Sequence, residues 1–198
     1  MKISIYSVIP VCLITAVFGF SGCVNLKPKP DLTKRYVLGP VGADSASSAT
    51  SRDLESIYVA RPELPTYLAT NRLVYRESGG ALTEIKDALW AEPFDQTVAR
   101  ALAEYLSSAS ATNYGFYPWQ NSRGNPIKVA VQFQRMDANA DGSILVTATW
   151  MVFKKGLKIK QGEYTSANLT WTVGDSDSYI SSLNSALNAL AREVGQQL

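Results

Sequence analysis

The 198-residue sequence predicts an α+β domain in which a largely antiparallel sheet carries two amphipathic helices. Residues 127–134 and 144–152 each alternate apolar with polar side chains, which is the pattern of half-buried strands. The polar segment 137–142 between them contains Asp, Asn and Gly, so the two strands are predicted to form a hairpin. Apolar residues spaced three and four apart across 180–194 predict a helix with one buried face.

The predicted elements begin with a short strand at 35–38, which Gly39 and Pro40 end. Residues 42–52 are small and polar, so we interpret them as a flexible loop. The alternating run 54–60 then predicts a second strand.

Segments 72–76 and 82–85 predict a hairpin around the Ser-Gly-Gly turn at 78–80. Pro93 is favoured at the first position of a helix and opens the next one. Its apolar face repeats every three or four residues. That face consists of Phe94, Val98, Ala101, Leu102, Tyr105 and Leu106.

After the hairpin of 127–152, a turn at 154–156 leads into a third strand, predicted to run from about 157 to 173. Ser176 or Asp177 is the expected N-cap of the last helix. Its buried face is predicted from Ile180, Leu183, Leu187, Leu190 and Val194.

The N-terminus has the layout of a secretory signal, with Lys2 followed by a mostly apolar stretch at 3–20. The segment Phe20-Ser21-Gly22-Cys23 resembles the bacterial lipobox, in which the cysteine is diacylated and the chain is cut just before it. The alternative is an uncleaved transmembrane helix, but the stretch is short for a span and Pro10 interrupts it.

We therefore expect a signal peptide at 1–22, a tether at 23–34 that begins with lipid-bearing Cys23, and a single periplasmic domain at 35–198. Two acyl chains give stable membrane anchoring. Bacterial lipoprotein sorting usually reads Asp after the cysteine as a signal to stay in the inner membrane. Val24 stands there instead, which predicts the periplasmic face of the outer membrane.

Composition argues against several functions. Loss of Lys2 with the signal lowers the formal charge from +2 to +1, which gives no support for nucleic-acid binding. The chain has no histidine, and Cys12 and Cys23 are its only cysteines, which excludes Ser-His-Asp catalysis, thiol nucleophiles and His- or Cys-ligated zinc. We expect the protein to be neither an enzyme nor the carrier of a cofactor. The spacing of its serine and carboxylate residues does not support a hydrolase that uses them.

Residues 137–142 also match the first half of an EF-hand calcium loop, with acidic or amide side chains at Asp137, Asn139 and Asp141. Such a loop needs a bidentate carboxylate at its twelfth position, which is Ala148 here. We therefore expect no metal site and interpret the segment as a polar hairpin loop.

Two surface features leave alternatives open. Four lysines around a predicted turn form either a solvated hairpin tip or a contact with anionic lipid headgroups. Four aromatic residues in one short run either pack as an edge strand or form a partner surface. The lysines are Lys154, Lys155, Lys158 and Lys160, and the aromatic residues are Tyr114, Phe116, Tyr117 and Trp119.

Several short motifs occur in a fixed order after the lipobox. They are Tyr36-x-Leu38, Leu64-Pro65-x-Tyr67-Leu68, Leu73-Val74-Tyr75-Arg76, Trp90-Ala91-Glu92-Pro93-Phe94, Arg100-x-Leu102 and Leu106. Together they make the chain resemble the ABC-type transport auxiliary lipoproteins, the PqiC-like family, over nearly all of its mature length. We expect the motif residues to be structural, with Pro65 shaping a bend and Trp90 packing on the first helical turn.

The resemblance implies an outer-membrane lipoprotein that acts beside an MCE-domain system moving lipids between membranes. Such a subunit would dock its MCE partner by binding rather than by catalysis. MCE proteins form rings, so the resemblance is also compatible with a homo-oligomer. The alternative is a lipid carrier that shields acyl chains in a cavity of its own.

Overall fold

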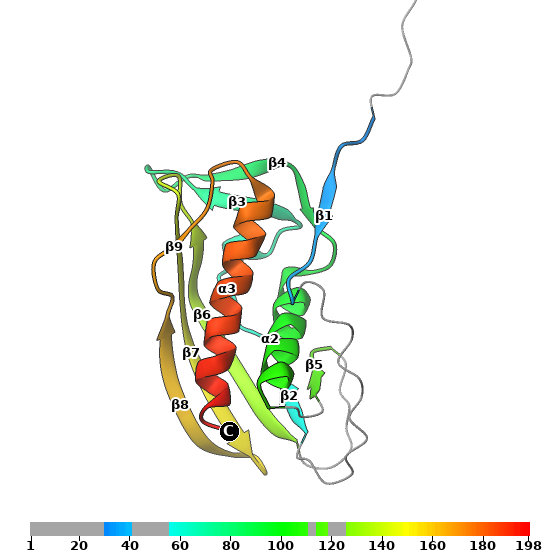
Figure 1. Cartoon of the computed structure of the whole chain (residues 1–198), viewed down its shortest axis with the longest axis vertical. Helices are drawn as coiled ribbons and strands as arrows, with labels where there is room; N and C mark the ends of the chain where they lie inside the picture. The colour runs from blue at the N-terminus through cyan, green and yellow to red at the C-terminus, as the bar shows by residue number, and fades with distance from the viewer. Residues whose placement is uncertain (1–29, 41–55, 111–113, 119–125) are drawn as a thin grey trace, which may run out of the picture. The chain divides into compact units, whose positions relative to one another are not determined.

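Two β-sheets and two helices form the unit Thr33–Leu198 in the computed structural model (Figure 1). The structure describes residues 30–40, 56–110, 114–118 and 126–198. The predicted signal peptide, Cys23 and most of the tether lie outside the described residues. Within the described ranges, no helix has the length and apolar character needed to cross a membrane.

The larger sheet has five strands in the order β5-β2-β6-β7-β8, and the short strand β9 pairs with β7. β2 pairs in parallel with both of its neighbours, and the remaining pairs are antiparallel. The α+β prediction is therefore confirmed, with a sheet that is mixed. The strands are β2 (Ile57–Val59), β5 (Tyr114–Phe116), β6 (Ile127–Ala138), β7 (Ser143–Lys154), β8 (Leu157–Thr165) and β9 (Leu169–Thr170).

The hairpin of β6 and β7 supplies most of the buried sheet surface. Alternate residues of β7 are buried, because successive side chains of a strand point to opposite faces. A bulge between Phe133 and Arg135 inserts one residue into β6. As a result Phe133 and Met136, three residues apart, both face the core. The loop is shorter than predicted, because β6 continues through Asp137 to Ala138.

The smaller sheet has the order β1-β4-β3 and comprises β1 (Lys34–Tyr36), β3 (Arg72–Arg76) and β4 (Leu82–Trp90). β1 pairs with β4 in parallel, and β3 pairs with β4 in the predicted antiparallel hairpin. Gly80 has φ +87°, which glycine adopts without strain in this turn. β4 runs five residues beyond the predicted end, and this extension delivers Trp90 to the start of the first helix.

Helices α2 (Phe94–Ser110) and α3 (Ser176–Gly195) pack together over one face of the larger sheet (Figure 1). The predicted apolar faces are the buried ones, with Leu102, Leu183 and Leu187 almost fully covered. The N-cap of α3 is Asp175, whose side chain accepts a hydrogen bond from the backbone of Asp177, so the predicted cap at Ser176 or Asp177 was wrong. The predicted third strand at 157–173 is divided into β8 and β9.

Candidate functional site: a groove between two motif segments

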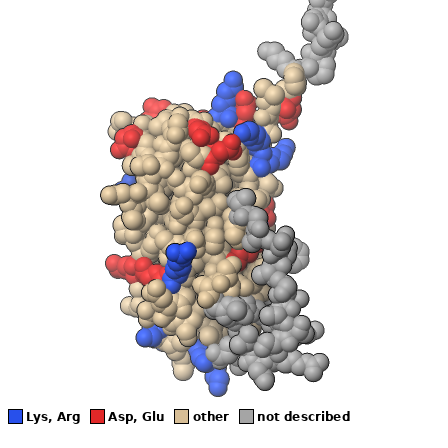
Figure 2. All heavy atoms as spheres, in the orientation of Figure 1, with Lys and Arg blue, Asp and Glu red and all other residues tan. Residues whose placement is uncertain are grey.

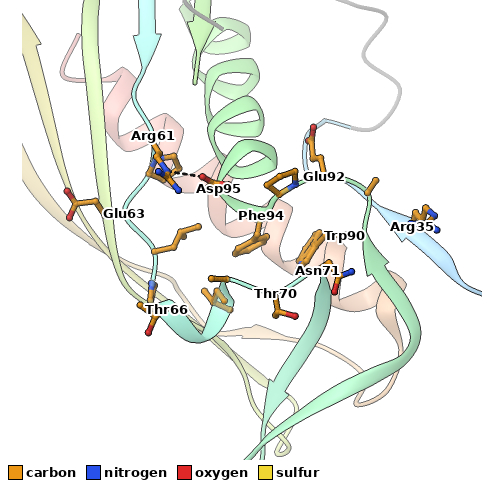
Figure 3. A pocket seen from close by; sticks show the side chains of 17 residues that line it. Arg35, Arg61, Glu63, Thr66, Thr70, Asn71, Trp90, Glu92, Phe94 and Asp95 are labelled. Carbon is orange, nitrogen blue, oxygen red and sulfur yellow. Dashed lines mark hydrogen bonds and ion pairs between the residues drawn. The ribbon is translucent and has the colours of Figure 1, made fainter. Parts of the chain in front are cut away.

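A cavity of about 1020 Å³ opens between the segments 61–71 and 90–95 (Figure 3). Ligand sites commonly have volumes of about 300–1,000 Å³, so this one is at the large end. Two of the predicted motifs line it, although they are separated by more than twenty residues in the chain. Of the nine residues that these motifs name, all except Tyr67 belong to the lining: Leu64, Pro65, Leu68, Trp90, Ala91, Glu92, Pro93 and Phe94.

The first wall of the groove follows β6 without becoming a full strand. The backbone N–H of Glu63 donates to Val131 O at 3.0 Å, and Glu63 O accepts from Phe133 N at 2.8 Å. Pro62 and Pro65 have no N–H, so neither can extend a regular ladder of hydrogen bonds. The chain consequently leaves β6 after Glu63 and turns into the groove.

A single 3-10 turn, η3 (Thr66–Leu68), completes this wall. Leu68 N donates to Pro65 O at 3.0 Å, and the Leu68 side chain is only 4% exposed. Pro65 therefore shapes a bend that returns Leu68 to the core, as the sequence predicted. Tyr67 points away from the groove, and its hydroxyl donates to Asp137 Oδ1 at 2.5 Å.

Asp137 lies in β6 and anchors the turn to that strand. The sequence-based prediction that it belongs to a polar hairpin loop was therefore wrong. Asp137 is buried and also accepts hydrogen bonds from Arg76 Nη2 at 3.2 Å and Arg135 Nε at 2.9 Å. Burial acts to raise the pKa of Asp137, but the bonds from Tyr67, Arg76 and Arg135 outweigh it and lower that pKa. Among the described residues, no group of three or more acidic, Cys or His side chains could hold a metal ion.

The second wall is the junction of β4 and α2. The ring centroids of Trp90 and Phe94 lie 4.6 Å apart. Trp90 therefore packs on the first turn of the helix, as the sequence predicted. Both side chains are about 5% exposed and form the apolar floor of the groove (Figure 3). Trp90 N donates to Asn71 O at 2.8 Å, so one backbone hydrogen bond ties this wall to the end of the first.

Ion pairs border the groove. Arg61 Nε donates to Asp95 Oδ2 at 2.9 Å and so links the two walls at one side, as the dashed line in Figure 3 shows. Glu92 Oε1 accepts from Arg100 Nη2 at 2.6 Å, behind the second wall. Burial acts to lower the pKa of Arg100, but its contacts with Glu92 and Glu104 outweigh burial and raise it.

The aromatic run lies beside this border and is partly buried. Tyr114 and Phe116 belong to β5, an edge strand, and their rings lie 6.3 Å apart. The guanidinium of Arg61 sits 5.3 Å from the ring centroid of Tyr117, which places that ring next to the groove. Trp119 lies outside the described residues. A partner-binding role for the run stays a prediction.

Sequence reasoning missed the convergence of the motifs and the roles of Arg61 and Asp95. Neither residue carries a local signal, because only the fold brings them together. The resulting site combines an apolar floor with a charged border. Such an arrangement suits noncovalent binding of a segment or molecule that has an apolar body and polar ends.

Comparison with known proteins agrees with this architecture. The model of a family described as "ABC-type transport auxiliary lipoprotein component" matches residues 36–195. The intermembrane transport lipoproteins PqiC of Escherichia coli K12 and of Shigella flexneri are each 26% identical over 131 residues, covering 66% of this chain and 69% of theirs.

Two crystal structures share the fold. One, of an uncharacterized protein, superposes with a TM-score of 0.64 at 20% identity and covers 83% of this chain and 98% of that one. The other, protein XCC0632 from Xanthomonas campestris, has a TM-score of 0.58 at 13% identity and covers 82% and 90%.

Proposed function

We propose a function for this chain on the basis of its family, since it belongs to the ABC-type transport auxiliary lipoprotein components. Its role is in intermembrane transport, as the names of its PqiC relatives suggest. The mature protein is anchored through lipid on Cys23 at the periplasmic face of the outer membrane. There it docks an MCE-domain protein of the transporter, and it acts by binding rather than by catalysis.

The observation that carries this proposal is the groove. Two motif segments, distant in the chain, are held together by the Trp90–Asn71 hydrogen bond and the Arg61–Asp95 pair, and they leave a large cavity between them. The groove combines an apolar floor with a few polar side chains at its border, which is the usual composition of a binding site. We infer that the groove receives a segment of the partner.

In-cell photocrosslinking tests the proposal. A benzophenone amino acid replaces Thr66, an exposed residue that lines the groove, in the full-length lipoprotein. We expect an adduct with an MCE-domain protein, identified by mass spectrometry. The matched control replaces Ala109, which is exposed on α2 away from the groove, and should give no such adduct. Equal adducts from both positions would count against docking in the groove.

The lipid-carrier alternative rests on the apolar floor formed by Trp90, Phe94 and Leu68. An acyl chain could lie against these side chains in place of a peptide segment. Lipid recovered with the crosslinked protein at near one-to-one, with no protein partner, would favour the carrier. Adducts between Thr66 and the MCE protein would favour docking.

A further inference from the structure

The end of the hairpin formed by β7 and β8 exposes apolar and basic side chains together. Leu157 is 72% exposed and Ile159 is 47% exposed, and both rank among the most exposed large apolar residues described. They alternate with Lys158 and Lys160 along β8. No acidic residue occurs between Asp141 and Glu163, so the hairpin tip is basic in sequence.

The backbone presents these side chains in a defined way. Lys155 and Gly156 both have positive φ, 51° and 80°, which is the conformation of a two-residue hairpin turn. Lys154 and Leu157 pair on either side of the turn. Ile159 is an extra residue in the ladder, because Lys158 and Lys160 pair with the adjacent residues Phe153 and Val152.

A fifth lysine extends the basic end across the sheet. Lys128 pairs with Phe153 between β6 and β7, and its Nζ lies 5.7 Å from the centroid of the Phe153 ring. In Figure 2, basic side chains appear without acidic ones at the lower end of the domain, where β7 ends. The upper end carries acidic and basic side chains together.

Protection of an edge strand explains only part of this pattern. β8 is an edge of the larger sheet, and lysines and bulges are devices that keep such edges from pairing with other chains. The same purpose would exclude Leu157 and Ile159 from exposed positions, because apolar side chains on an edge favour association. The two apolar residues therefore call for a second explanation.

We propose that this hairpin tip binds the surface of an anionic membrane, with Leu157 and Ile159 entering the headgroup region and the lysines contacting lipid phosphates. Exposed apolar side chains flanked by lysines are typical of peripheral membrane contacts. A protein interface is the weaker explanation, since lysine is depleted at interfaces where Arg and aromatic residues are enriched.

The inference rests on the proposed lipid anchor and adds an orientation to it. β1, where the chain enters the domain, begins at the end opposite the hairpin tip (Figure 1). β7 has twelve residues and spans about 40 Å at the rise of an extended strand. Contacts at both ends make the domain lie along the membrane, whereas an anchor at one end alone leaves it free to tilt.

A fluorescent probe at the tip tests this contact in the full-length lipoprotein. Ile159→Cys is labelled with an environment-sensitive dye, and the protein is reconstituted into vesicles of phosphatidylcholine with or without phosphatidylglycerol. We expect a blue shift and quenching by spin-labelled lipid only in vesicles with phosphatidylglycerol. Both should be lost at about 1 M salt, where the Debye length is about 3 Å.

Matched variants separate the contributions. A dye at Leu82→Cys, which is 42% exposed on β4, should give no shift. Replacing Lys154, Lys155 and Lys158 with Gln should abolish the shift at Ile159, and Leu157→Ser, in which every lysine is retained, should reduce it.

Three results would overturn the inference: no shift in either vesicle, an equal shift in both, or a shift that appears only when the MCE protein is added. The lipid anchor is checked separately in the wild-type protein. Labelling of Cys23 by the thiol-reactive dye would refute its acylation. In that case the Ile159→Cys probe is placed in a chain with Cys12 and Cys23 replaced by Ala, and its response to added vesicles still reports on the hairpin tip.

Discussion

The Tyr67→Phe substitution isolates the hydrogen bond that holds the first wall of the groove to β6. The hydroxyl donates to Asp137, which is 3% exposed, so the bond joins a neutral donor to a buried charged acceptor. Such bonds contribute about 1.5–3 kcal/mol to stability. Arg76 and Arg135 continue to bind the carboxylate, so we expect a loss of about 2 kcal/mol in the free energy of unfolding.

The assay is thermal and urea unfolding of the purified lipoprotein, followed by tryptophan fluorescence. A loss of about 2 kcal/mol corresponds to a fall in Tm of roughly 4–8 °C for a domain of this size. Tyr105→Phe is the matched control, because Tyr105 is half-buried on α2 and the structure gives its hydroxyl no hydrogen bond among the described residues. Equal losses in the two variants would refute the reasoning.

The same cluster predicts a dependence on pH. The pKa of Asp137 is lowered in the folded protein, so its contribution to stability is present above the unfolded pKa of about 3.9. That contribution is lost as the pH falls through the lower, folded pKa. The stability difference between wild type and Asp137→Asn should be constant near neutral pH and shrink below about pH 4. A difference that stays constant into acid would contradict this account.

Three further substitutions test other parts of the structure. Gly162→Ala should destabilise the domain by about 1–3 kcal/mol in thermal unfolding, because the added Cβ would overlap the indole of Trp150. Arg61→Ala should change stability by no more than about 1 kcal/mol, since that side chain is largely exposed, yet it should weaken the Thr66 crosslink by opening one side of the groove. Cys23→Ala should remove the protein from the outer-membrane fraction, because acylation and the cut before the cysteine both depend on this residue, and an unchanged outer-membrane fraction would disprove anchoring through it.

Local patterns predicted most elements because their periodicity reports burial directly. The alternation along 144–152 and the repeat along 180–194 each follow from one buried face, whatever the partner of that face. The bend at Pro65 and the contact of Trp90 with Phe94 were also predictable, since proline restricts φ and the two aromatic residues lie four positions apart.

Pairings between distant segments were not predictable from such patterns. β2 lies parallel to β6, and the chain between them forms most of the smaller sheet and all of α2. Short parallel strands contain no local signal that names their neighbour. The role of Asp137 was not predictable for the same reason. Its sequence neighbours indicate a loop, whereas its buried hydrogen bonds come from Tyr67 and Arg76, which are distant in the chain.

The sequence by itself determined the α+β class, both helices, the β6–β7 hairpin and the motifs that mark the family. The tertiary structure alone decided that two of those motifs face each other across one groove, with Arg61 and Asp95 at its border. The physical reason is that side-chain periodicity is fixed by each element separately. A binding surface depends instead on which elements pack together, and that packing is settled by the free energy of the whole chain.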